Sequence, residues 1–359
     1  MRRLAAALLL LALAGCSPFD GLDAFDALVQ LRSGADPARG ESRPGRREIS
    51  WPGGEGDLYQ LPGSKPGAAL VLVPGLAPEG RRDPRLVLLA DALARKRFAV
   101  LIPDLSDFAR QRISVRDKEP IAAALRHLLG QNQGPVGVAA ISYASGPAIL
   151  AVLEPDLRQR VGFVVAIGGY SDSEAVTTFF TTGYFRAPGG VWRQATPNAY
   201  GKWVFVLANA ERIEHAPGRV ALTALARRKL ADLDADVSDL ETGLGSEGEA
   251  VVSLLANRAP ERVPGLIERL PRAVRDDLAA LSLAGRDFAS VAARFHLVHG
   301  RDDAIVPYTE SEALARSLPA NKVRLTLLES FAHAALTPGG LLDLYRMWAA
   351  LTALMAERQ

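Results

Sequence analysis

Short runs of consecutive apolar residues alternate along the chain with segments in which apolar residues recur every three or four positions. An uninterrupted run is typical of a strand buried on both faces, and the wider spacing is typical of an amphipathic helix. The predicted strands, in chain order, are residues 69–75, 98–104, 135–142, 161–169, 295–300 and 323–328. This alternation predicts an α/β fold with a mostly parallel sheet covered by helices on both faces.

The helical pattern surrounds these strands and also fills one long segment between two of them. The predicted helices near the strands are residues 85–98, 120–130, 146–154 and 341–355. The segment from Tyr170 to about Arg286 is far longer than an ordinary connection. It carries helical patterns at 220–233, 247–256, 266–270 and 274–283. The aromatic residues in its first part could line a pocket or form the core of the segment itself.

The first residues have the pattern of a targeting signal. Met1, Arg2 and Arg3 precede an apolar run from Leu4 to Leu13 that is too short to span a bilayer comfortably. The run ends in Leu-Ala-Gly-Cys, which resembles the lipobox of bacterial lipoproteins. That resemblance implies cleavage before Cys16, its lipidation, and attachment to a periplasm-facing membrane, with Ser17 favouring the outer membrane. An ordinary secretory peptide is the alternative.

These patterns divide the chain into five parts. A signal peptide is expected at residues 1–15. The lipidated cysteine and a polar tether that contains Gly and Pro are expected at 16–47, and residues 20–32 within this tether could form a short amphipathic helix. The folded core is expected at 48–170 and 287–359, and the inserted helical segment at 171–286. Cys16 is the only cysteine, so no disulfide within the chain is possible.

Composition and charge narrow the classes of function. With 48% hydrophobic residues the chain of 359 residues can bury a large core, as one elaborated domain or two. The formal net charge is only +2, and arginines are interleaved with acidic residues. A nucleic-acid partner is therefore not expected. No metal-ligand spacing, phosphate-binding loop or dinucleotide motif is present, so no cofactor is expected.

The segment Ala-Ala-Ile-Ser-Tyr-Ala-Ser-Gly, residues 139–146, follows a predicted buried strand and precedes a predicted helix. A nucleophile on so tight a turn needs small residues two positions before and after it. Ser142 has Ala140 and Ala144 there, whereas Ser145 has Tyr143 and Pro147. Of the two serines, Ser142 is therefore the candidate nucleophile.

This strand, turn and helix resemble the nucleophile elbow of the α/β-hydrolase superfamily, with alanine at both usual glycine positions. The resemblance implies a serine hydrolase with the chain order nucleophile, acid, histidine, and a helical cap inserted over the active site. Gly300 to Pro307 resembles the loop G-x-x-D-x-x-V-P, which assigns the acid to Asp303. Asp302, next to it, and Asp172, after an earlier strand, remain alternatives.

The loop after the last predicted strand carries His333, where this superfamily has its catalytic base. His296 and His299 lie in or at the end of the preceding strand and are expected to pack or to support the site, and His215 falls in the inserted segment. A serine at its ordinary pKa is a poor nucleophile, which is why a base and an acid are needed.

The resemblance also implies an oxyanion hole. Its two backbone N–H donors would be those of Tyr143, after the nucleophile, and Leu76, in the loop after an earlier strand. The expected substrate is a small molecule with a carboxylic ester, and thioesterase, amidase and acyl-transfer chemistry use the same groups. A catalytically idle scaffold that binds a ligand or partner at the cell envelope is the second hypothesis. The sequence leaves the natural substrate and the oligomeric state open.

Overall fold

The computed structural model describes residues 21–23, 44–76, 79–105, 108, 112–132, 134–331 and 340–359. Its main sheet has eight strands in the order β1-β2-β4-β3-β5-β6-β9-β10. The strands are β1 Gly45–Trp51, β2 Gly54–Gln60, β3 Ala68–Val73, β4 Phe98–Pro103, β5 Val136–Ile141, β6 Phe163–Ile167, β9 Arg294–Gly300 and β10 Val323–Leu328. β2 runs antiparallel to both of its neighbours, β1 and β4, and every other adjacent pair in this sheet is parallel. The predicted mostly parallel sheet is confirmed, and its order is that of the α/β-hydrolase fold.

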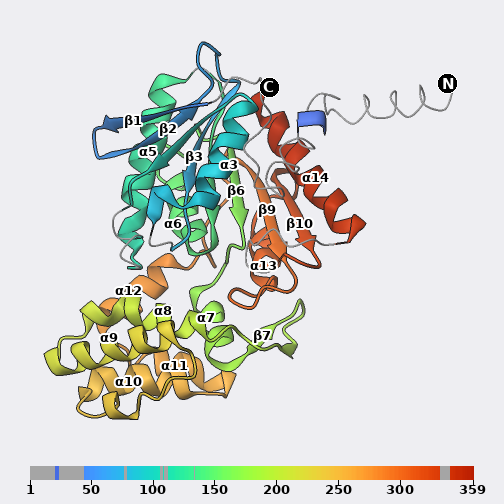
Figure 1. Ribbon diagram of the computed structural model, residues 1–359. Helices are drawn as coiled ribbons and strands as arrows, with labels where there is room; N and C mark the ends of the chain where they lie inside the picture. Colours follow the sequence, from blue (N-terminus) through green and yellow to red (C-terminus); the bar gives the residue numbers. More distant parts are fainter. Residues whose placement is uncertain are drawn as a thin grey trace.

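Helices cover both faces of this sheet, as predicted (Figure 1). On one face α3 (Pro84–Arg95) and α14 (Leu341–Met355) pack against alternate side chains of the central strands. On the other face α5 (Lys118–Gln131), α6 (Ser145–Val152) and α13 (Thr309–Ser317) form the larger core. Helix α3 begins where expected because Pro84 follows a capping residue, Asp83, whose carboxylate accepts the Arg85 N–H at 2.9 Å.

Two features at the start of the chain differ from the sequence expectation. Strand β1 begins at Gly45, so it includes the last residues of the expected tether. Within that tether, residues 21–23 contact the folded body: the Trp348 indole donates to the Gly21 carbonyl at 2.7 Å, and the Arg358 guanidinium donates to the Asp23 carboxylate at 2.7 Å. The chain between Cys16 and these contacts is therefore shorter than the expected tether.

A group of helices lies between β6 and β9 in the sequence and is called the cap segment here (residues 173–281). It contains α7 Ser173–Thr182, the hairpin of β7 Tyr184–Arg186 and β8 Trp192–Gln194, α8 Tyr200–Asn209, α9 Ala216–Ala231, α10 Gly245–Ala256, α11 Val263–Ile267 and α12 Arg272–Leu281. These helices bury a core of their own. Figure 1 shows them gathered at one end of the molecule. The Asn198 N–H donates to the Ala304 carbonyl at 2.7 Å, which places this end at the carboxyl edge of the sheet.

No helix in the part of the chain that the structure describes is long and apolar enough to span a membrane. Residues 1–20, which hold the predicted signal peptide and Cys16, lie outside the described residues.

Candidate active site

Ser142 directly follows β5 and begins a single 3-10 turn, Ser142–Ala144, which continues into α6. Its backbone has a φ of +58°, and Arg97 is the only other described residue besides glycine with a positive φ. Such a conformation is strained for a residue with a Cβ, and strain of this kind is found at functional sites. The small residues Ala140 and Ala144 beside the turn are fully packed in the core. The turn therefore holds Ser142 at the tip of a central strand.

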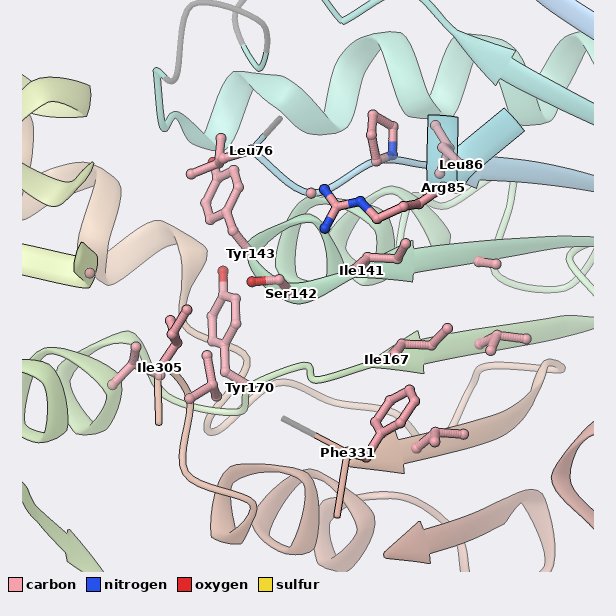
Figure 2. A pocket seen from close by; sticks show the side chains of 18 of the residues that line it. Leu76, Arg85, Leu86, Ile141, Ser142, Tyr143, Ile167, Tyr170, Ile305 and Phe331 are labelled. Carbon is pink, nitrogen blue, oxygen red and sulfur yellow. The ribbon is translucent and has the colours of Figure 1, made fainter. Parts of the chain in front are cut away.

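A cavity of about 520 Å³ opens at Ser142, and most of its walls are apolar. Figure 2 shows the Ser142 hydroxyl pointing toward the side of the cavity formed by Leu76, Tyr170 and Ile305. Ser145, in contrast, is completely buried and its hydroxyl has no hydrogen-bond partner. The two serines that the sequence offers thus have different surroundings, and only Ser142 lines the cavity.

Leu76 and Tyr143 both lie beside Ser142, as the sequence analysis expects of the two oxyanion donors (Figure 2). Gly75 brings the loop close: a Cβ placed on it would lie 3.9 Å from the Ser142 Cβ. Tyr143 is in the first turn of its helix, where backbone N–H groups have no partner within the helix. Both residues therefore line the cavity next to Ser142.

Hydrogen bonds hold the Tyr143 side chain. The Ser114 N–H donates to the Tyr143 hydroxyl at 2.9 Å, and the hydroxyl donates to an Asp117 carboxylate oxygen at 2.7 Å. Burial raises the pKa of Tyr143 well above its ordinary value, so the group remains a neutral phenol. These contacts fix the residue that follows Ser142.

Asp302 and Asp303, the adjacent carboxylates of the predicted acid loop, have separate partners. Asp303 is 6% exposed, and its Oδ1 accepts the N–H groups of Ile305 at 2.8 Å and Val306 at 3.0 Å. Asp302 Oδ1 instead accepts the Phe331 N–H at 2.8 Å. Asp302 therefore links its loop to Phe331, which follows β10. Of the two carboxylates, Asp303 is the buried one.

His299 is fully buried behind Asp303, with its Nε2 3.3 Å from Asp303 Oδ2 and 3.0 Å from the Val306 carbonyl oxygen. Because both oxygens accept hydrogen bonds, Nε2 carries the proton, and Nδ1 accepts from the Ser311 hydroxyl at 2.7 Å. His299 thus supports the loop that carries Asp303 and Val306. Packing or support of the site was the role expected of it from the sequence.

His333 lies outside the described residues, as does the rest of 332–339, so the structure does not place the predicted base. Phe331, two residues before it, lines the same cavity as Ser142 (Figure 2). The other histidines have different partners. His296 Nε2 is 2.8 Å from a Glu357 carboxylate oxygen, and His215 caps α9 by accepting the Gly218 N–H at 3.2 Å.

Asp172, the remaining candidate acid, caps α7. Its Oδ1 accepts the Glu174 N–H at 2.9 Å and the Ser282 hydroxyl at 3.2 Å. Its own N–H donates at 2.7 Å to Glu310, a residue that the sequence analysis did not single out. Glu310 is buried, and burial raises its pKa to about 7.

The aromatic residues of the cap segment serve both purposes that the sequence left open. Phe180 and Phe205 belong to the core of the cap segment and also line the cavity at Ser142. Tyr170 also lines the cavity, a role that the sequence did not predict. Its hydroxyl lies so close to Gly146 that a Cβ added to Gly146 would be 1.9 Å from the hydroxyl oxygen. Among the described residues, no group of three or more His, Cys, Asp or Glu side chains could hold a metal ion.

No protein-family model matches the chain. Among solved structures, a 2,6-dihydroxy-pseudo-oxynicotine hydrolase is 16% identical with a TM-score of 0.45, over 87% of this chain and 68% of that one. A meta-cleavage product hydrolase from Pseudomonas fluorescens is 16% identical with a TM-score of 0.47, over 86% and 97%. A putative hydrolase from Legionella pneumophila is 12% identical with a TM-score of 0.49, over 92% and 94%. At these identities and TM-scores, the similarities assign no activity to this chain.

Proposed function

We propose that this protein is a serine hydrolase that cleaves a carboxylic ester or a related acyl bond. The observation that carries the proposal is Ser142, held with a φ of +58° at the tip of a central strand and facing an apolar cavity of about 520 Å³. A strained turn that presents a serine to such a cavity suits nucleophilic attack on a bound acyl group. In this proposal Asp303 is the acid and His333 is the base.

In the first half of the reaction, Ser142 Oγ attacks the acyl carbonyl carbon while His333 accepts the hydroxyl proton. The tetrahedral intermediate collapses, the bond to the leaving oxygen breaks, and that oxygen takes the proton from His333. In the second half, water attacks the acyl-Ser142 ester and gives its proton to His333. The serine then leaves with that proton, and the carboxylic acid is released.

Electrostatic stabilisation of the oxyanion is assigned to the backbone N–H groups of Leu76 and Tyr143. In hydrolases, loss of one such donor typically costs about 3 kcal/mol of transition-state stabilisation. The Tyr143 hydroxyl bonds to Ser114 and Asp117 support this role, because they hold the residue that donates. A substrate that fills the largely apolar cavity would displace water from Ser142, which would strengthen each of these interactions.

The proposed location rests on the sequence alone. A signal peptide over residues 1–15 and lipidation of Cys16 would anchor the enzyme to a periplasm-facing leaflet, of the outer membrane if Ser17 acts as in the lipoprotein sorting pattern. Several acyl chains on one residue provide stable anchoring, which a single chain does not.

Turnover of a simple ester distinguishes an enzyme from an idle scaffold. The purified protein should hydrolyse p-nitrophenyl butyrate, and Ser142→Ala should reduce kcat by at least about 10³-fold. Ser145→Ala is the matched control, because Ser145 is buried outside the cavity and should retain activity within about threefold. No turnover by the folded wild-type protein across short-chain esters and thioesters would favour the scaffold.

A further inference from the structure

The cavity at Ser142 extends in two directions. One arm, called the cap arm, runs between α7 and α8 and is lined by Phe180, Val204 and Tyr200. Tyr200 is 38% exposed, whereas Phe180 and Val204 are buried. The second arm, called the sheet arm, runs back from Ser142 between the sheet and the two helices α3 and α14, which contribute Leu93 and Leu354 among others. The two arms differ in what encloses them.

Strand register defines the floor of the sheet arm. Ile141, Ile167 and Val298 are aligned across β5, β6 and β9 and form a first row next to Ser142. Ala139, Val165 and His296 form a second row, two residues further from Ser142. Because side chains alternate along a strand, both rows face α3 and α14, and all six residues line the cavity.

The third row closes the sheet arm. Gly137 is aligned with Phe163, and a Cβ on Gly137 would lie 2.3 Å from the Phe163 ring, so the ring covers that position. Phe163 is fully buried and packs edge-on against Phe98. On the side of β9, His296 is held by Glu357 at 2.8 Å. The sheet arm is therefore a channel that starts at Ser142 and is closed at its inner end. On the α3 side the cavity is also lined by Arg85, whose side chain is 86% exposed and pairs with Asp83 at 2.7 Å (Figure 2).

The depth of this channel follows from strand geometry. From Ser142 to Ala139 the chain advances three residues, or roughly 10 Å at about 3.3 Å per residue. An extended alkyl chain advances about 1.3 Å per carbon, the projection of a C–C bond. The channel to the second row thus accommodates about eight carbons.

We propose that the sheet arm binds a medium-chain acyl group of about eight carbons, while the cap arm holds the leaving alcohol. The inference rests on the proposed function, since it takes Ser142 as the nucleophile. The closed inner end of the sheet arm suits the acyl group, which stays bound to Ser142 after acylation, whereas the leaving group must depart. The acyl group is apolar because five of the six floor residues are apolar. The sixth, His296, bonds to Glu357 through Nε2 and leaves only its buried Nδ1 without a partner. A charged or polyhydroxylated acyl group would lose its water without compensation.

The test is the dependence of kcat/KM on acyl length with one leaving group. With p-nitrophenyl esters from acetate to dodecanoate, kcat/KM should rise roughly two- to fourfold per methylene up to about eight carbons and then fall. Ala139→Leu fills the second row, so the ratio of octanoate to acetate kcat/KM should collapse at least about tenfold. Val204→Phe, the matched variant in the cap arm, should leave this ratio unchanged. Melting temperatures check folding, and Ala139→Val is the milder replacement if Ala139→Leu does not fold.

Each outcome has a distinct meaning. A flat acyl-length profile in a wild-type protein that hydrolyses acetate overturns this inference and leaves the proposed function standing. A ratio that collapses in Val204→Phe but not in the Ala139 variants places the acyl group in the cap arm and also overturns it. Absence of Ser142-dependent hydrolysis for every ester length overturns the proposed function itself.

Discussion

Asp302 and Asp303 differ in their partners although they are adjacent. We predict that Asp303→Asn reduces kcat by about three orders of magnitude. The amide oxygen can still accept the N–H groups of Ile305 and Val306, but the amide NH₂ then faces His333 and favours the wrong tautomer of its imidazole. Asp302→Asn should keep the bond from Phe331 N–H and retain kcat within about threefold. Steady-state kinetics on p-nitrophenyl butyrate provides the comparison.

Circular dichroism of both variants separates a chemical effect from unfolding. A larger loss in Asp302→Asn than in Asp303→Asn would move the acid by one residue. If both variants kept full activity, Asp172 would be the next candidate, and its role in capping α7 would have to coexist with catalysis.

The size of neighbouring residues and loop spacing selected Ser142 and Asp303 from the sequence. In the structure Ser142 lines the cavity and Asp303 is a buried carboxylate. Those signals are local. Glu310 could not be predicted in this way, because its hydrogen-bond donor, the N–H of Asp172, is 138 positions away in the sequence. The contact of His299 with Asp303 depends likewise on how β9 and the loop after it fold together.

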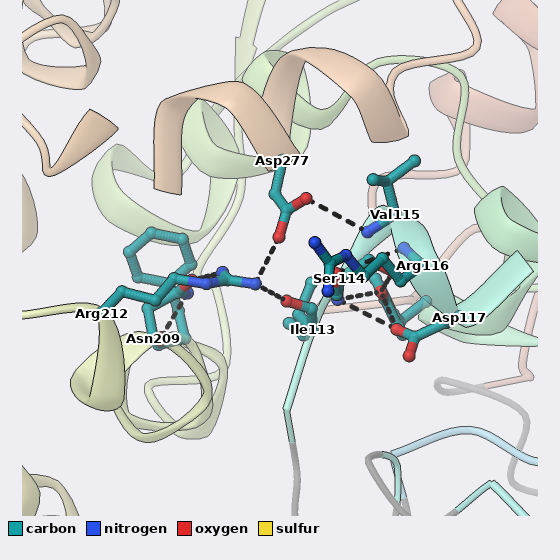
Figure 3. Close-up of polar contacts among 10 residues, drawn as sticks. Ile113, Ser114, Val115, Arg116, Asp117, Asn209, Arg212 and Asp277 are labelled. Atoms are coloured by element: carbon teal, nitrogen blue, oxygen red, sulfur yellow. Dashed lines mark hydrogen bonds and ion pairs between the residues drawn. The ribbon is translucent and has the colours of Figure 1, made fainter. Parts of the chain in front are cut away.

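At the scale of elements, a polar contact joins the cap segment to the loop that holds Tyr143. The Arg212 guanidinium donates to the Ile113 carbonyl and to Asp277 of α12, and Asp277 accepts the Val115 N–H at 3.3 Å (Figure 3). Ser114, within this loop, donates its N–H to the Tyr143 hydroxyl. The contact therefore links the position of the cap segment to the residue beside the nucleophile.

We predict that Arg212→Ala lowers kcat/KM by about tenfold and the free energy of unfolding by about 1–3 kcal/mol, because Asp277 and the Ile113 carbonyl lose a charged partner. A double-mutant cycle with Asp277→Ala should give a coupling energy above 0.5 kcal/mol. Arg275→Ala, on α12, is the matched control. Its partner Glu268 is 76% exposed, so the free energy of unfolding should fall by less than about 1 kcal/mol. Additive effects of Arg212 and Asp277 would contradict the account.

The central strands β3, β4, β5 and β6 were predictable because they are nearly uninterrupted apolar runs. All six predicted strands agree with the structure apart from their ends. The hairpin of β1 and β2 was missed for the opposite reason. β1 is mostly exposed and polar, and β2 buries Asp57, which pairs with Arg46 at 2.9 Å and with Arg81 at 3.4 Å. A buried carboxylate with partners from distant segments leaves no periodic signal in the sequence.

At the scale of the whole molecule, the proposed lipid anchor would hold the enzyme close to the membrane. Gly21 contacts Trp348 of α14, and the extended chain from Cys16 to Gly21 spans no more than about 18 Å. We predict that the wild-type protein fractionates with membranes and carries acyl mass on its N-terminal peptide. Cys16→Ala should abolish the acyl mass and either block processing or release the protein from the membrane.

Mass spectrometry of that peptide is the decisive readout for the anchor. Unchanged membrane fractionation of Cys16→Ala, together with an unmodified N-terminus in the wild-type protein, would contradict the lipoprotein proposal while leaving the hydrolase proposal intact.

Covalent labelling by a fluorophosphonate tests the central claim, a nucleophilic Ser142, without knowledge of the natural substrate. Intact-mass analysis of the wild-type protein should show one adduct, and peptide mapping should place it on Ser142. Ser145→Ala should be labelled at a rate similar to the wild type, and Ser142→Ala should remain unlabelled while it melts as a folded protein. Labelling that persists in Ser142→Ala, or its absence from the folded wild-type protein, would contradict the account.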